Sequence, residues 1–161
     1  MPRSAMSVRE ELSDREVIFR RLLDAPRELV WKVWTDPQHL HQWWGPDGFT
    51  TTTHEFSFVA GGVWRHIMHG PDGTDYPNVI VFREIVPPSR LVYENAWSLP
   101  GVPVDFTVVC LFEAEGAKTR FSLHITFKDA DAFKTAVERY GVLDGGTQTL
   151  DRLAAYVDTI A

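Results

Sequence analysis

Residues 50–127 contain a succession of short strand-like segments whose connections are too short for anything but antiparallel pairing. Aromatic and β-branched residues alternate with polar ones, and the breaks fall at turn-forming sequences such as Gly61-Gly62, Pro87-Pro88 and Glu115–Lys118. A parallel pair of strands needs a crossover of a dozen or more residues, and none of these connections offers one. The segment therefore predicts an antiparallel meander.

Two short helices are expected just before this meander. Asp24 or Ala25 is the predicted cap of the first helix, Pro26 suits its first turn, and apolar residues recur along it at helical spacing. Asp36, followed by a proline, repeats the cap and begins a second helix that ends at Gly45.

The longest predicted helix covers residues 142–160 and follows a short one over residues 129–141. Alternation over residues 15–23 indicates one more strand near the N-terminus. An antiparallel sheet buries one face, and only the last helix is long enough to cover it. The sequence therefore predicts an α+β fold, with a curved antiparallel sheet of about seven strands around the C-terminal helix and two short helices after the first strand.

Length and charge limit the classes of protein to which the chain can belong. Its 161 residues predict a single domain over residues 15–161, preceded by a loose, polar tail over residues 1–14. The tail lacks the apolar centre of a signal peptide, and no apolar run approaches the ~20 residues of a membrane span. A net charge of −6 argues against nucleic acid as a partner. The single cysteine, Cys110, is expected to be a small buried residue, which fits a cytoplasmic protein.

Two histidines are the candidate chemical groups. Strict alternation places His54 on the face shared by Phe56, and His66 on the face shared by Trp64 and Met68. The apolar company predicts that both faces point inward. Three interpretations stay open for the pair: histidines satisfied by hydrogen bonds in the core, polar groups lining a cavity, or a general acid and base. A metal site would need a third ligand, and none stands at motif spacing, so neither metal nor cofactor is expected.

A cavity between the sheet and the long helix is the predicted binding site. Aromatic residues recur along the predicted strands, and a cavity lined by them suits a small hydrophobic or aromatic molecule. The predicted lining consists of Trp43, Trp44, His54, Phe56, Trp64, His66, Met68, Tyr93, Trp97, Phe112, Phe121, Gly146 and Leu150. Asn95 shares a strand face with Tyr93 and is expected to add a polar contact.

Four of the six tryptophans fall within residues 30–49. Trp34 lies on the apolar stripe of the first short helix and is predicted to be core, whereas Trp31 lies off the stripe and is predicted to be partly exposed. Trp43 and Trp44 precede the Gly45 break. We expect one of the two to close the end of the cavity and the other to pack outward or stay partly exposed to solvent.

The motifs in this chain resemble a known family. The segments "LDAPRELVWKVWTDPQHLHQWWGPDGF", "GGVWR", "MHGPDGTDYP", "FREIVPPSRLVY" and "QTLDRLAAYV" are similar to the bacterial branch of the activator of Hsp-90 ATPase homologue family, within the START-like (SRPBCC) superfamily. The resemblance runs from Glu16 to Ala161 and implies a helix-grip fold.

The resemblance implies three functions. The first is binding of a small hydrophobic ligand, such as a lipid or polyketide, between sheet and helix. The second is a cyclase- or hydrolase-like enzyme that uses the cavity histidines. The third is a co-chaperone-like interaction with another protein, although we do not expect this chain to carry the additional N-terminal domain of the eukaryotic activators. The oligomeric state is left open.

One departure from the family pattern concerns the start of the long helix. Relatives commonly carry Gly-Trp-x-Gln there, whereas this chain has "GGTQ", with Gly146 in the tryptophan position. Replacing an indole by hydrogen opens volume unless a neighbour fills it. The sequence therefore predicts a wider cavity mouth or a kinked first turn.

Overall fold

The computed structural model describes residues 8–97 and 106–161 of the chain, and it leaves the side chains of Ala96 and Trp97 outside the description. The strands are β1 (Val8–Ser13), β2 (Glu16–Leu23), β3 (Thr50–Phe56), β4 (Val63–His69), β5 (Asp75–Val86), β6 (Arg90–Trp97), β7 (Phe106–Glu115) and β8 (Lys118–Phe127), and the helices are α1 (Arg27–Thr35), α2 (Pro37–Trp43), α3 (Ala130–Tyr140) and α4 (Val142–Ile160).

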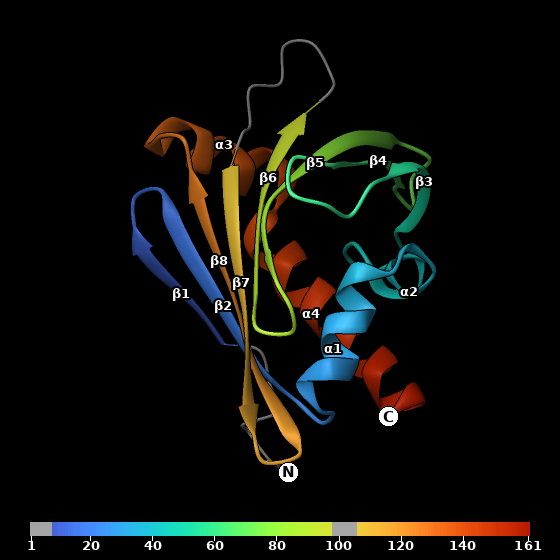
Figure 1. Cartoon of the computed structure of the whole chain (residues 1–161). Helices are drawn as coiled ribbons and strands as arrows, with labels where there is room; N and C mark the ends of the chain where they lie inside the picture. Colours follow the sequence, from blue (N-terminus) through green and yellow to red (C-terminus); the bar gives the residue numbers. More distant parts are fainter. Residues whose placement is uncertain (1–7, 98–105) are drawn as a thin grey trace.

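The strands form one antiparallel sheet in the order β1-β2-β8-β7-β6-β5-β4-β3. Strands β3 to β8 are consecutive neighbours, which is the meander that the short connections predict, and β2 joins it by pairing with β8. Figure 1 shows the sheet curving around α4, with α2 beside β3 and α1 packed against β7 and β8. The predicted fold class and helix-grip arrangement are confirmed, with eight strands instead of about seven.

The additional strand corrects the expectation of a loose tail over residues 1–14. Residues Val8–Ser13 form β1, an edge strand that pairs with β2. All six of its residues are exposed, so no alternation between apolar and polar positions marks it in the sequence. Residues 1–7 lie outside the described part of the chain.

The short helices begin close to the predicted positions. The N-cap of α1 is Pro26, one or two residues later than predicted, and no side chain caps that end. Asp36 caps α2 as expected, because its carboxylate accepts a hydrogen bond from the Gln38 backbone amide at 2.9 Å.

Helix α4 supplies the cover for the concave face. Leu150, Leu153 and Val157 are buried along one stripe of the helix. No helix in the described ranges is long and apolar enough to cross a membrane.

Candidate functional site

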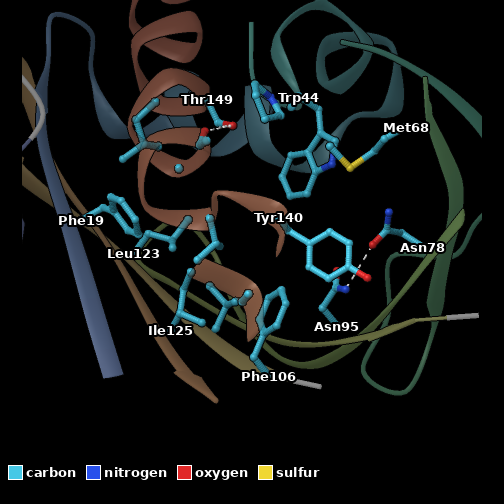
Figure 2. Close-up of a pocket in the computed structure, with 18 of the residues that line it drawn as sticks. Phe19, Trp44, Met68, Asn78, Asn95, Phe106, Leu123, Ile125, Tyr140 and Thr149 are labelled. Atoms are coloured by element: carbon cyan, nitrogen blue, oxygen red, sulfur yellow. Dashed lines mark hydrogen bonds between the residues drawn. The ribbon is translucent and has the colours of Figure 1, made fainter. Parts of the chain in front are cut away.

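A cavity of about 210 Å³ lies between the concave face of the sheet and helices α3 and α4. Its walls are Phe19, Trp34, Trp44, Gly45, Pro46, His66, Met68, Asn78, Tyr93, Asn95, Phe106, Val108, Leu123, Ile125, Ala136, Tyr140, Val142, Gly145, Gly146, Thr149 and Leu150. Figure 2 shows Phe106, Leu123 and Ile125 on one side of this space and Trp44 and Thr149 on the other. The lining is largely apolar, with a few polar groups gathered near one end.

About half of the predicted lining residues border this space. Those that do are Trp44, His66, Met68, Tyr93, Gly146 and Leu150. Those that do not are Trp43, His54, Phe56, Trp64, Phe112 and Phe121. The side chain of Trp97 lies outside the description.

The prediction that His54 faces inward is wrong. Thr53 pairs with His66 and Glu55 pairs with Arg65, so His54 is the extra residue of a β-bulge. The bulge interrupts the alternation on β3, and His54 is exposed. Thr53 takes the inward position instead, where its hydroxyl accepts a hydrogen bond from the indole of Trp64 at 2.9 Å.

The two tryptophans at the end of α2 lie in different surroundings, but only one of them is placed as predicted. Trp44 borders the cavity, and its ring contacts those of Trp64 and His66 edge to face. Trp43 does not pack outward: it is fully buried against Trp34, and its indole N–H donates to the Val33 carbonyl at 3.2 Å.

Trp31 is also more deeply placed than the helical stripe predicts. Its exposed fraction is only 9%, because its ring packs edge to face on Phe112 at 5.2 Å and contacts Phe58 at 6.2 Å. Helix α1 therefore buries a wider part of its surface than a single apolar stripe.

The remaining predicted aromatics belong to the core around the cavity. Phe112 and Phe121 are fully buried and pack on each other and on Trp34, under α1. Phe56 contacts Phe82 and Trp64 near the bulged end of β3. These rings shape the walls from behind without facing the open space.

The volume vacated at Gly146 is filled by a neighbour. A Cβ atom placed on Gly146 would lie 2.6 Å from Cζ of Phe19, so the phenyl ring occupies the space beside the glycine. Helix α4 runs from Val142 to Ile160 through this position. Phe19 belongs to β2 and is not among the predicted lining residues. It reaches the cavity because β2 packs against α4 in the folded chain.

Three buried polar side chains form a row across neighbouring strands at one end of the cavity. His66 on β4 stands opposite Asn78 on β5, and Asn95 on β6 donates a hydrogen bond to the Asn78 amide oxygen at 3.2 Å. The Asn78 amide nitrogen donates to the carbonyl of Tyr76 at 3.0 Å. Figure 2 shows the hydroxyl end of Tyr140 pointing toward the two asparagines. Asn78 was not predicted, because alternation alone does not reveal its register against His66.

His66 is the most constrained of these groups. Its exposed fraction is 2%, its ring stacks on Trp64 with centroids 3.9 Å apart, and neither ring nitrogen has a hydrogen-bond partner among the described residues. Burial lowers the pKa of His66 from 6.5 to about 4. The imidazole is therefore neutral at pH 7.

The buried His66 predicts a specific acid sensitivity. Between pH 6.5 and about 4 the unfolded chain binds a proton at this residue that the folded chain does not, so stability falls as the pH falls through this window. From this shift we expect wild type to lose about 3 kcal/mol more unfolding free energy between pH 7 and pH 4 than His66→Phe does. Urea unfolding at several pH values measures the difference. The exposed-site variant His54→Phe should follow wild type, and equal pH profiles for all three proteins would contradict the assignment.

Helix α4 also holds the loop that carries the cavity wall after α2. The Arg152 guanidinium donates hydrogen bonds to the carbonyls of Gly45 at 2.9 Å and Pro46 at 2.8 Å. The side chain of Gln148 accepts one from the Asp47 backbone amide at 3.2 Å. These contacts fix Trp44 and its neighbours against the helix, and nothing in the local sequence pattern predicts them.

Removing the arginine should loosen this loop. Since hydrogen bonds from a charged group are worth about 1.5–3 kcal/mol, we expect Arg152→Leu to lower the unfolding free energy by about that amount. Amide hydrogen exchange of Gly45 and residues 47–49 should accelerate more than that of the sheet. Arg120→Leu, which removes only an exposed ion pair with Glu115, serves as the control and should change stability by less than about 1 kcal/mol. Unchanged exchange in Arg152→Leu would show that the loop is held by other contacts.

Cys110 is fully buried on β7, in agreement with the sequence interpretation, and burial raises the pKa of its thiol. In the described ranges no group of three histidine, cysteine or carboxylate side chains is placed to hold a metal ion.

Comparisons with known proteins extend over nearly the whole chain. A family model described as activator of Hsp90 ATPase homolog 1-like protein matches residues 24–158. No curated protein matches. A protein of Arthrobacter aurescens solved by NMR superposes with a TM-score of 0.88 at 22% identity, covering 97% of this chain and 92% of that one.

Two crystal structures give the same result. A protein of Chromobacterium violaceum has a TM-score of 0.81 at 23% identity, over 91% of this chain and 99% of that one. A Silicibacter pomeroyi protein named AHSA1 has a TM-score of 0.72 at 20% identity, over 91% of this chain and 99% of that one. At these identities the superpositions establish the fold, and the family model establishes the relationship. The chain belongs to the family of proteins that resemble activator of Hsp90 ATPase homolog 1.

Proposed function

We propose that this protein binds a small aromatic molecule of one or two rings in the cavity between the sheet and α4. The observation that carries the proposal is the composition of the walls: the rings of Phe19, Trp44 and Phe106 and the aliphatic side chains of Leu123 and Ile125 surround a space with few polar groups. Such a lining stabilises an apolar ligand by removing its surface from water.

The cavity volume sets the size of this ligand. An apolar cavity of about 150 Å³ is enough for benzene, whereas pockets for drug-sized ligands start at about 300 Å³. The 210 Å³ observed here lies between these values. It suits a substituted single ring or a compact pair of rings better than the lipids, sterols and larger polyketides that the family resemblance includes.

The exposed side chains favour this function over a protein-interaction role. The large hydrophobic residues exposed in the described ranges are Val8, Leu12, Val59, Val86 and Ile160. They are divided among β1, β5, α4 and the connection between β3 and β4, which does not resemble the contiguous patch expected of a docking site. The enzymatic alternative keeps only one of its two candidate histidines, because His54 does not border the cavity.

A size series tests the proposal. A ligand that binds only the folded state raises its stability by mass action, so thermal unfolding in the presence of toluene, naphthalene, palmitate and cholesterol reports on the site. We expect saturable increases in Tm with toluene and naphthalene and none with palmitate or cholesterol. The proposal fails if neither arene raises the Tm, or if the sterol or fatty acid produces the largest increase.

A further inference from the structure

The polar end of the cavity contains one buried side chain, His66, whose hydrogen-bonding capacity the fold does not use. His66, Asn78 and Asn95 are each at least nine-tenths buried, and they come from three adjacent strands. Buried polar side chains in a fold are normally paired with one another or with the backbone. Here Asn78 and Asn95 are bonded to each other, but both nitrogens of His66 lack a partner among the described residues while the side chain borders the cavity.

An unpaired buried imidazole is unfavourable for the fold alone. A ligand that supplies the missing hydrogen bond therefore gains affinity from a group that is already desolvated and held in place. Stacking on Trp64 and the edge contact with Trp44 fix the plane of the imidazole before any ligand arrives. A ring held in this way loses little freedom on binding, which favours affinity.

The charge of this end of the cavity selects the kind of ligand group. Apart from His66, no acidic or basic side chain lines the cavity in the described part of the chain. A ligand carboxylate or ammonium would be buried without a counter-charge, which is strongly unfavourable. The burial that lowers the pKa of His66 keeps the imidazole neutral at pH 7, so it provides no cation either.

The donors and acceptors at this end of the cavity limit the polar group of the ligand further. A neutral imidazole has one donor and one acceptor nitrogen, and each asparagine amide offers both kinds of atom. A hydroxyl group is the smallest group that donates and accepts at once. It can donate to the acceptor nitrogen of His66 and accept from an asparagine amide beside it, whereas a ketone or ether can only accept.

We propose that the ligand is a hydroxylated aromatic compound, a phenol in its neutral form, whose ring lies among the apolar walls and whose hydroxyl group bonds to His66 beside the Asn78–Asn95 pair. This inference rests on the proposed function, because it names the polar group of a ligand bound in the same cavity. The ring of such a ligand matches the apolar end of the cavity, and its hydroxyl group matches the polar end.

Three probes that differ at one group test this inference. Isothermal titration compares 4-ethylphenol with 4-ethyltoluene, in which methyl replaces the hydroxyl, and with 4-ethylbenzoate at pH 7. We expect 4-ethylphenol to bind roughly ten- to a hundredfold more tightly than 4-ethyltoluene, and the carboxylate to bind more weakly than either. If 4-ethyltoluene binds as tightly as the phenol, or if the benzoate binds best, the inference is overturned while the proposed function stands. If none of the three binds, the proposed function itself fails.

A matched pair of variants tests whether His66 is the residue that recognises the hydroxyl group. His66→Phe keeps a flat ring on Trp64 but removes both nitrogens, and His54→Phe makes the same change at an exposed position. We expect His66→Phe to weaken 4-ethylphenol about tenfold or more and to leave 4-ethyltoluene within about threefold of wild type. His54→Phe should change neither affinity. Equal loss of both ligands in a folded His66→Phe would contradict the proposed contact, and should that variant not fold, the ligand series on wild type decides the question alone.

Discussion

Replacing Trp43 by alanine should lower the unfolding free energy by about 3–5 kcal/mol, the usual range for deleting a buried large aromatic side chain. Trp43 has no exposed surface, packs against Trp34 with ring centroids 4.8 Å apart, and donates its N–H to a backbone carbonyl. Truncation would leave a void and an unpaired acceptor. Urea unfolding followed by circular dichroism measures the loss.

The adjacent Trp44 provides the contrast. Its side chain is half-buried and borders the cavity. Trp44→Ala should therefore lower the unfolding free energy by less than half as much as Trp43→Ala does. It should also weaken toluene binding more than Trp43→Phe does. If Trp43→Ala is too unstable to purify, the pair Trp43→Phe and Trp44→Phe should keep the same order of stability. Equal stability losses at both positions would contradict the division between a core tryptophan and a cavity tryptophan.

Filling the cavity from α4 should abolish ligand binding without unfolding the protein. Thr149 lines the cavity of 210 Å³, and a cavity of about 150 Å³ is enough to hold one benzene ring. A phenylalanine at this position would therefore take most of the space that a ligand needs. We expect Thr149→Phe to weaken naphthalene binding on the order of a hundredfold or more, while stability changes by about 1 kcal/mol. Calorimetric titration and urea unfolding measure the two effects.

Thr147 offers a matched control on the same helix. Both threonines donate their hydroxyl to the carbonyl four residues earlier, Thr147 to Leu143 and Thr149 to Gly145, but Thr147 does not border the cavity. Thr147→Phe therefore removes the same hydrogen bond and adds the same ring. Its affinity for naphthalene should stay within about threefold of wild type. Comparable losses in the two variants would place the binding site elsewhere.

The fold could be predicted where local chemistry and packing agree. The alternation within residues 50–127 and the short turns between the segments leave an antiparallel meander as the only simple arrangement, and the apolar stripe of α4 supplies its cover. Strand β1 escaped prediction because all its residues are exposed, so it carries no pattern for either face. It depends on pairing with β2 rather than on burial.

The cavity was predictable in its place but only partly in its residues. His54 was misplaced because a β-bulge shifts the alternation by one position, and nothing in the threonine-rich sequence of β3 marks where the extra residue falls. Phe19, Asn78 and Arg152 were missed for a different reason. Each reaches the site through contacts with an element distant in sequence, and such register is decided by packing of the whole fold.

The central claim is that an aromatic ligand occupies the space between the sheet and α4, and intermolecular NOEs locate such a ligand directly. In protein labelled at methyl groups and saturated with naphthalene, we predict NOEs from the ligand to the methyl groups of Leu123, Ile125 and Val108, which line the cavity. NOEs confined to Val59 and Val86, whose side chains are exposed on the surface, would contradict the account.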